Sequence, residues 1–361
     1  MRDAIVYGYD WEGASTTVRI ALAMARAGGK VLHCDSVSSV IRRQDRRLHS
    51  LEPNLYTFRP RILASRLNRY PGMPRMQGAA VARQILGHAQ ALGLNNPVFV
   101  YAWMGPLLAP ICQAMKARGC LLVHAHTHYL EGMEDEHVGQ SDLTLVISRP
   151  AFHRLRARWG GKTLFIPDAV NLRPFRGLRA GPEDAPSMLA GVPRPRLGYA
   201  GANAHDHLNK RVLRELLERH PEWHFVSFQW RPSVFGMTPA VPLPNAHLLP
   251  WQAAEPFARC VAAFDIGFMP YDCSNVVLYN NPPMKLWDYF ALGLPVVATP
   301  LIHLRDYEGL VYLGETAPGL EKAVEAALAE PRDSPLREKR KERAEKHSVE
   351  ALGRLLNEIL G

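Results

Sequence analysis

The sequence has few cysteines and no long apolar stretch. The cysteines of the 361-residue chain are odd in number and form no Cys-x-x-Cys pair: Cys34, Cys112, Cys120, Cys260 and Cys273. A disulfide framework is therefore not expected. No apolar run approaches the ~18 residues that a membrane span needs, and the first residues, MRDAIVYGYDWEG, lack the pattern of a signal peptide. These absences predict reduced thiols and a cytoplasmic protein.

Motifs of nucleic-acid-binding modules are also lacking. The chain carries 43 Lys and Arg against 34 Asp and Glu, a formal net charge of +9, which favours an anionic partner such as a nucleotide, a phospholipid surface or nucleic acid. No RNP, zinc-finger or helix-turn-helix signature accompanies that charge, so no nucleic-acid partner is expected. Hydrophobic residues make up 47% of the chain, which suits a globular protein with room for two domains.

Strand-like and helix-like segments alternate along the chain. The alternation stops over residues 173–195, which are rich in proline, glycine and charge, and resumes with RLGYAG. It predicts parallel sheets covered by helices on both faces. We therefore expect an α/β protein with two Rossmann-like domains facing a cleft, residues 1–172 and 196–345, joined by a linker over 173–195. One charged helix, roughly 334–360, ends the chain, and its last part, 346–361, can pack back on the N-terminal domain.

The segment NNPPMKLWDYFALGLPVVATP, residues 280–300, predicts a helix followed by a buried strand. Two prolines suit a helix start, and the apolar residues Leu286, Tyr289, Phe290 and Leu292 then recur at helical spacing. Gly293 suits the helix end, and residues 295–298 suit a short buried strand. Lys285 falls in the first turn, where the helix dipole disfavours a cation. An anion bound at that helix start would resolve the conflict, with Lys285 neutralising it.

Three segments resemble a known family. FIPDAVNLRPF resembles the interdomain signature of GT-B glycosyltransferases, PPMKLWDYFALGLPVVAT resembles their donor-site helix and the next strand, and FDIGFMPY resembles the strand before it. The likeness is to family-4-type (group 1) enzymes and spans about residues 1–345. It implies transfer of a sugar from a nucleotide-diphosphate sugar, bound by the C-terminal domain, to an acceptor bound by the N-terminal domain.

The resemblance locates a donor site, from which this chain departs at two positions. Where the family has two glutamates eight positions apart, this chain has Asn280 and Asp288. Asp288 is expected to accept hydrogen bonds from ribose hydroxyls. Asn280 replaces the glutamate that contacts the donor sugar, so the sugar and the stereochemical outcome stay open.

The diphosphate has further candidate ligands. Gly201 permits close approach of a ligand after the strand RLGYAG. Lys210 or Arg211, which open the next helix, and Arg231, which follows the strand FVSFQW, can each donate to phosphate oxygens. In GT-B proteins the helix dipole and basic side chains replace Mg²⁺, so the resemblance implies no metal and no cofactor beyond the nucleotide sugar itself.

Candidate catalytic residues lie in the N-terminal half. Asp10 follows the first strand and can bind acceptor hydroxyls or act as a base. His126 or His128, at the end of the strand CLLVHAH, can take a proton from an acceptor hydroxyl. With His124, these histidines alternate and would share one strand face; a zinc site there is the less favoured alternative, because no closed set of ligands accompanies them.

Arginines are dense between residues 41 and 75. They are Arg42, Arg43, Arg46, Arg47, Arg59, Arg61, Arg66, Arg69 and Arg75. Interleaved with tyrosine, phenylalanine and leucine, they indicate either a solvated basic loop or a surface for anionic lipid headgroups or a lipid-diphosphate acceptor. For the membrane contact the first four arginines are the candidates, which would make the protein peripheral on the inner face of the membrane.

The sequence thus predicts a metal-independent glycosyltransferase that moves a sugar from a nucleotide-diphosphate sugar to a polysaccharide or lipid-linked acceptor. The alternatives are a degenerate nucleotide-sugar-binding protein without transferase activity, suggested by Asn280, and another GT-B-like enzyme such as a sugar-nucleotide epimerase.

Overall fold

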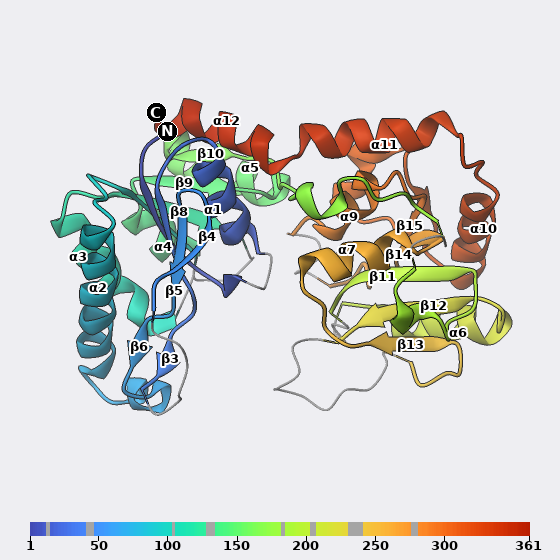
Figure 1. Ribbon diagram of the computed structural model, residues 1–361, viewed down its shortest axis with the longest axis horizontal. Helices are drawn as coiled ribbons and strands as arrows, with labels where there is room; N and C mark the ends of the chain where they lie inside the picture. Colours follow the sequence, from blue (N-terminus) through green and yellow to red (C-terminus); the bar gives the residue numbers. More distant parts are fainter. Residues whose placement is uncertain are drawn as a thin grey trace. The chain divides into compact units, whose positions relative to one another are not determined.

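The computed structural model describes residues 1–11, 15–40, 47–102, 105–127, 134–181, 185–202, 207–229, 241–275 and 281–361. These residues form two compact units (Figure 1). Unit 1 comprises Met1–Ala169 and Val349–Gly361, and unit 2 comprises Val170–Ser348.

Unit 1 is built on a sheet that has eight strands in the described residues. In spatial order they are β10 (Thr163–Phe165), β9 (Leu143–Val146), β8 (Leu121–His126), β7 (Val98–Tyr101), β1 (Ala4–Tyr7), β2 (Val31–Cys34), β5 (Leu55–Phe58) and β4 (His49–Glu52). Neighbouring strands are parallel, except that β4 runs antiparallel to β5. A separate parallel pair joins β3 (Ser38–Ser39) to β6 (Arg61–Ile62).

Helices cover both faces of this sheet. They are α1 (Thr16–Arg26), α2 (Met73–Ala91), α3 (Leu108–Ala117), α4 (Glu134–Gln140), α5 (Arg149–Trp159) and α12 (Val349–Leu360), with short 3-10 turns η2 (Ser65–Arg69), η3 (Gly105–Leu107) and η4 (Gly160–Lys162). Successive side chains of a strand point to opposite faces. Ala4 and Val6 of β1 therefore join the core under α1 and α12, whereas Ile5 and Tyr7 join the core under α2 and α3.

Unit 2 contains a fully parallel sheet, which has six strands in the described residues. In spatial order they are β13 (Ala246–Leu249), β12 (His224–Phe228), β11 (Arg196–Ala202), β14 (Ile266–Met269), β15 (Val296–Ala298) and β16 (Tyr312–Leu313). Its helices are α6 (Lys210–Arg219), α7 (Ala254–Ala262), α9 (Lys285–Ala291), α10 (Ala317–Leu328) and α11 (Pro335–Lys346), with η5 (Arg173–Phe175), η6 (Ser187–Leu189) and η7 (Ile302–Tyr307). The predicted alternation of strands and helices is confirmed in both units.

The prediction of a linker over residues 173–195 is wrong for the part of that segment that the structure describes. The segment belongs to unit 2, and Phe175, Leu189 and Val192 are buried in its core. The guanidinium of Arg196 donates to the carbonyls of Leu189 and Val192. Proline and glycine fit these turns without making the segment a free connection.

The prediction of a single C-terminal helix is also wrong, because the segment forms two helices. The helix breaks at His347 and Ser348, where the backbone N–H of Val170 donates to the carbonyl of His347 at 2.8 Å. Helix α11 belongs to unit 2, whereas α12 packs on α1 in unit 1. Helices α12 and α1 approach closely because Gly353 of α12 has no side chain: a Cβ there would lie 2.7 Å from the carbonyl oxygen of Ala23 in α1.

The thiols and the helix lengths complete the outline of the fold. All five cysteines are free, and only Cys273 among them is exposed. In the part of the chain that the structure describes, no helix is long and apolar enough to cross a bilayer.

Candidate functional site

The lysine singled out by the sequence is enclosed by two tyrosines of unit 2. Lys285 is the first residue of α9, and its Nζ donates to the hydroxyl of Tyr271 at 2.9 Å. The same Nζ lies 4.5 Å from the ring centroid of Tyr199 and 5.4 Å from that of Tyr271. Ring faces attract a cation at such distances. Lys285 therefore has partners within the protein in addition to the anion that the sequence predicts at this helix start.

The tyrosines keep this lysine charged. Burial by itself favours the neutral amine, but Tyr199 and Tyr271 outweigh it and raise the pKa of Lys285. Burial in turn raises the pKa of the Tyr271 phenol, against the opposing effect of the lysine. At neutral pH Lys285 is thus an ammonium ion that donates to the neutral phenol of Tyr271, and this partner does not cancel its positive charge.

The absence of a side chain at Gly201 makes room for Lys285. A Cβ at Gly201 would lie 2.7 Å from Cε and 3.2 Å from Nζ of Lys285. The absence of a side chain therefore lets the lysine stem pass along β11 towards the tyrosines. Two predicted donor-site residues that are distant in sequence are brought together here, and the space beside Gly201 on that side is filled by Lys285.

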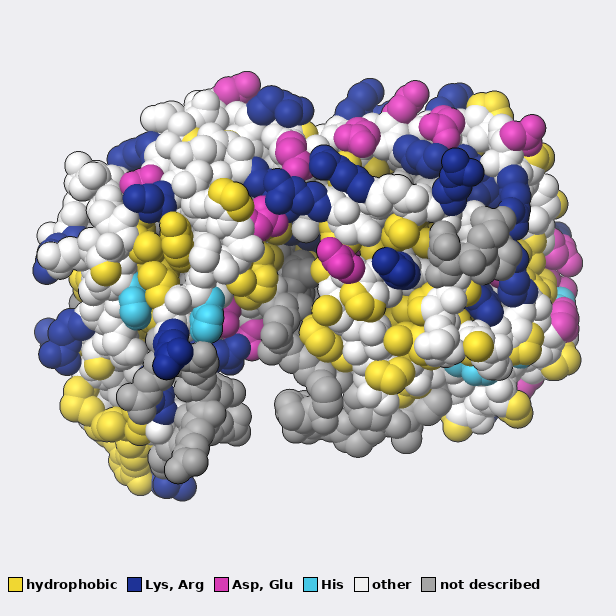
Figure 2. All heavy atoms as spheres, in the orientation of Figure 1, with side chains coloured by type: hydrophobic (Ala, Val, Ile, Leu, Met, Phe, Trp, Pro, Cys, Tyr) yellow, Lys and Arg dark blue, Asp and Glu magenta, His cyan; other side chains and the backbone are white. Residues whose placement is uncertain are grey.

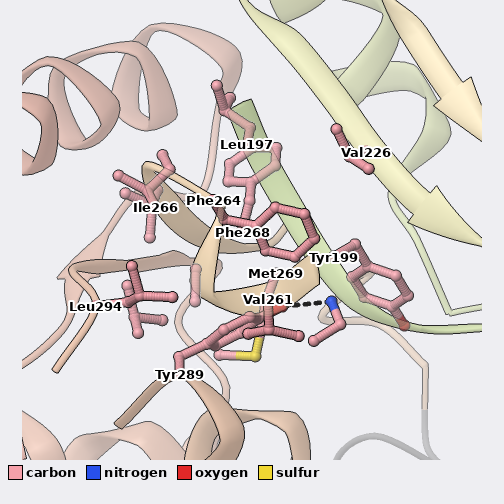
Figure 3. Close-up of a cluster of buried hydrophobic side chains, with 14 of the residues drawn as sticks. Leu197, Tyr199, Val226, Val261, Phe264, Ile266, Phe268, Met269, Tyr289 and Leu294 are labelled. Atoms are coloured by element: carbon pink, nitrogen blue, oxygen red, sulfur yellow. Dashed lines mark hydrogen bonds between the residues drawn. The ribbon is translucent and has the colours of Figure 1, made fainter. Parts of the chain in front are cut away.

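Tyr289 fixes α9 to the sheet. Its hydroxyl accepts a hydrogen bond from the backbone N–H of Ala200 at 2.7 Å and donates to the carbonyl of Gly198 at 2.8 Å. Figure 3 shows the ring reaching under β11 from α9, among buried side chains. The ring occupies space at Gly267, where a Cβ would lie 2.4 Å from its Cγ. This anchoring sets the position of Lys285, four residues earlier on the same short helix.

Basic residues at the start of α6 lie beside this site. The backbone of residues 207–209 runs along that of 270–272, with Asn209 N–H donating to Pro270 and Asp272 N–H donating to His207, each at 2.9 Å. The Asn209 side chain caps α6. Lys210 and Arg211 follow directly and are both exposed.

The remaining donor-site candidates are distributed as follows. Asp288 is partly buried in the first turn of α9, on the same helix as Lys285. Arg231 and Asn280 lie outside the described residues. The sequence analysis missed Tyr199 and Tyr271, although Tyr199 lies within β11 and Tyr271 follows β14 by two residues, and the analysis had identified both strands.

Asp10 belongs to a network of charges in unit 1. Its carboxylate accepts hydrogen bonds from the backbone N–H of Ser36 at 3.1 Å and from the hydroxyl of Ser36, and it pairs with Arg59 at 3.2 Å. Arg59 also pairs with Asp35 at 3.3 Å. Burial opposes ionisation of Asp35, but hydrogen bonds and charge from His33, followed by the Trp11 N–H and Arg59, lower its pKa overall. With these donors around it, the Asp10 carboxylate is arranged as a hydrogen-bond acceptor.

The histidines of β8 form a buried cluster. The rings of His124 and His126 lie 5.8 Å apart on one strand face, as their spacing predicts. His124 also lies 5.6 Å from His137 of α4. Burial, with these neighbours, holds the pKa of His124 well below its ordinary value, so its ring is neutral. His128 lies outside the described residues, and among those residues no group of three or more His, Cys, Asp or Glu is placed to hold a metal.

The proposed membrane arginines are mostly outside the described residues. Arg42, Arg43 and Arg46 fall there, whereas Arg47 is described and exposed. In the described residues, Lys285 of unit 2 thus lies next to Gly201, another predicted site residue, and Asp10 of unit 1 lies in a network of charged side chains.

Comparison with known proteins identifies the fold. No protein-family model matches the sequence, and no curated protein matches it. Solved structures match along the whole chain. An α,α-trehalose-phosphate synthase (UDP-forming) from Burkholderia xenovorans, in complex with glucose-6-phosphate, is 12% identical with a TM-score of 0.71, over 99% of this chain and 100% of that chain. The trehalose-6-phosphate synthase OtsA is 14% identical with a TM-score of 0.69, and Anabaena Alr3699/HepE in complex with UDP-glucose is 13% identical with a TM-score of 0.65, each over 99% of both chains. The chain therefore has the GT-B fold of these glycosyltransferases, as the sequence motifs predicted.

Proposed function

We propose that this protein is a glycosyltransferase that moves a sugar from a nucleotide-diphosphate sugar to a glycan or lipid-linked acceptor. The observation that carries the proposal is the ammonium of Lys285, held by Tyr199 and Tyr271 beside the carboxyl ends of β11 and β14. Ligands of open parallel sheets bind at those strand ends. The structural neighbours include Anabaena Alr3699/HepE in complex with UDP-glucose.

The chain's own groups can hold a diphosphate. An ammonium has three N–H donors, which Lys285 shares with Tyr271 and Tyr199 in this structure. A remaining donor can bind a phosphate oxygen, and Lys210 or Arg211 at the start of α6 can supply a second charge. Asp288 would accept from the ribose hydroxyls. Because this donor set is cationic, we propose binding without a metal ion.

Calorimetric titration with UDP-, GDP-, ADP- and TDP-sugars, with and without EDTA, tests this function. We expect one nucleotide to bind in EDTA and its sugar to be released slowly in the absence of acceptor. Binding without any sugar release or transfer would instead identify a nucleotide-sugar-binding protein. Binding that EDTA abolishes and Mg²⁺ or Mn²⁺ restores would overturn metal independence.

We further propose a peripheral contact with the inner face of an anionic membrane through Arg42, Arg43, Arg46 and Arg47. Each basic residue near such a surface contributes about 1 kcal/mol. Replacing all four with serine should weaken sedimentation with phosphatidylglycerol vesicles. Equal sedimentation of the parent and the variant would rule out this contact.

A further inference from the structure

The sheet of unit 2 reverses its strand order between β11 and β14. From β11 the chain continues to β12 and β13 on one side of the sheet, and from β14 it continues to β15 and β16 on the other. Ligands of open parallel sheets bind beyond the carboxyl ends of the strands at such a reversal. The geometry of these two strand ends therefore shapes the proposed donor site.

Strands β11 and β14 part before they end. Among the residues that the structure describes, the two strands pair at Leu197–Ile266 and Gly198–Gly267 and no further, although each strand continues beyond these pairs. On its other side, β11 shifts its register against β12 between Gly198 and Ala202. The carboxyl end of β11 thus departs from a regular ladder on both sides.

The hydroxyl of Tyr289 occupies the gap between β11 and β14. Residues two apart on a strand turn their backbone groups to the same neighbour, so the N–H of Ala200 faces β14, as Gly198 does. That N–H donates to the Tyr289 hydroxyl at 2.7 Å, and the hydroxyl donates to the carbonyl of Gly198 at 2.8 Å (Figure 3). Burial raises the pKa of this phenol well above its ordinary value, so its proton is present. The hydroxyl takes the place of a strand partner for a buried N–H.

Two paired glycines leave room for aromatic rings at this point. A Cβ at Gly198 would lie 1.9 Å from Cδ2 of Phe264, and a Cβ at Gly267 would lie 2.4 Å from Cγ of Tyr289. A side chain at Gly267 would therefore push the Tyr289 ring away from β11. The gap depends on both the sheet and the helix.

Lys285 contacts the ends of the same two strands. It precedes Tyr289 by four residues on α9, so both side chains leave the helix on one face. Its Nζ lies 4.5 Å from the ring centroid of Tyr199 in β11 and 2.9 Å from the hydroxyl of Tyr271, which follows β14. The distance between the strand ends thus sets where the ammonium lies.

The surface charge over α11 does not select an anion by itself. Helix α11 packs on α9, and Figure 2 shows basic and acidic side chains intermixed over it. Glu338 and Lys341, for example, pair at 2.7 Å. Because opposite charges offset each other at a distance, phosphate affinity depends on the position of single cations such as Lys285.

We propose that Tyr289 is a positioning residue of the donor site: its hydroxyl replaces a β14 carbonyl at Ala200 and keeps the strand ends at the separation that places Lys285 on a diphosphate. This inference rests on the proposed glycosyltransferase function and adds to it a buried residue that touches no ligand. Phosphate affinity then depends on a hydroxyl that acts only through Lys285.

Calorimetric titration of Tyr289→Phe tests the proposal. The variant keeps the ring and loses both bonds to β11, so affinity for the nucleotide sugar and for inorganic pyrophosphate should each fall about three- to tenfold. Tyr312→Phe is the matched control. The Tyr312 hydroxyl donates to Glu330 at 2.9 Å on the edge strand β16, so its loss should lower the melting temperature and leave both affinities unchanged.

A double-mutant cycle with Lys285→Met shows whether Tyr289 acts through the lysine. Coupled residues give non-additive losses, so Tyr289→Phe should change pyrophosphate affinity by less than about twofold once Lys285 is replaced. Losses that multiply independently in the double variant, or parental affinity of Tyr289→Phe for both ligands, would overturn the proposal.

Hydrogen exchange gives a second arm that needs no variant of Tyr289. Coupling is reciprocal, so pyrophosphate should slow exchange of the Ala200 amide in the parent and leave it unchanged in Lys285→Met. Exchange of this amide that ignores pyrophosphate in the parent would also refute the role of Tyr289.

Sugar release separates this claim from the proposed function. A chain in which Tyr289→Phe weakens pyrophosphate binding only while Lys285 is present, but which neither releases nor transfers a sugar, refutes the proposed function and keeps the role of Tyr289. A parent that binds neither the nucleotide sugar nor pyrophosphate overturns both.

Discussion

The two units each place a cation at the carboxyl ends of parallel strands, but they give it different partners. In unit 1, Arg59 pairs with two carboxylates, those of Asp10 and Asp35. In unit 2, Lys285 is held by two phenols, those of Tyr199 and Tyr271. Carboxylates cancel a cation's charge, whereas phenols position it and leave the charge in place. The comparison therefore supports a structural role for Arg59 and the proposed anion binding at Lys285.

Lys285→Met gives the largest expected effect. Loss of a charged hydrogen bond to phosphate should cost about 1.5–3 kcal/mol, or roughly ten- to a hundredfold in nucleotide affinity by calorimetry. The melting temperature should also fall, because the methionine leaves the Tyr271 hydroxyl without its 2.9 Å partner. Lys322→Met, at an exposed position of α10, is the control. Parental nucleotide affinity in Lys285→Met would remove the donor-site assignment.

Asp288→Asn should act on one part of the ligand only. Its carboxylate is expected to accept from ribose hydroxyls, so affinity for the nucleoside diphosphate should fall by about three- to tenfold, since one such bond contributes about 0.5–1.5 kcal/mol. Affinity for inorganic pyrophosphate should stay at the parent value. Equal losses for both ligands would show that Asp288 acts through the helix and not through ribose.

Gly201→Ala should move the lysine without removing it. The added Cβ meets the Cε of Lys285, the far part of a flexible side chain, so the stem can shift at little cost to stability. We expect a reduction of a few-fold in nucleotide affinity and a nearly unchanged melting temperature. A large loss of stability would mean that the backbone, and not the lysine, yields to the methyl group.

Asp35→Asn tests the structural side of the comparison by its pH dependence. The folded-state pKa of Asp35 is lowered, so its contribution to stability is present above the unfolded pKa of about 3.9 and is lost as pH falls through the folded value. The variant should therefore lose less stability than the parent between about pH 4 and pH 2, measured by urea unfolding. Identical acid unfolding of parent and variant would contradict the role of Asp35.

The pKa of Lys285 is shifted in the opposite direction, upwards. Its contribution to stability is therefore complete below the unfolded pKa of about 10.4 and is lost only as pH rises through the folded value. Deprotonation of this lysine should consequently cause no loss of nucleotide affinity between pH 7 and pH 9.

Local sequence pattern determined much of helix α9 and the following strand β15. The predicted buried positions Leu286, Tyr289 and Phe290 are buried, Gly293 has the positive φ of 67° expected after a helix end, and β15 lies within the predicted strand. These features follow from residues close in the sequence, whose periodicity and backbone preferences are readable without a partner.

What surrounds Lys285 was decided only by the tertiary structure. Tyr199 and Gly201 lie far from Lys285 in the sequence, whereas Tyr271 lies 14 residues before it. All three meet the lysine because β11 and β14 are neighbours in the sheet and Tyr289 fixes α9 beneath them. The same holds for the break between α11 and α12, which depends on Val170 pairing with His347. Charge in a sequence shows where a cation is, but only the packing of distant strands decides whether a carboxylate neutralises it or a phenol keeps it available.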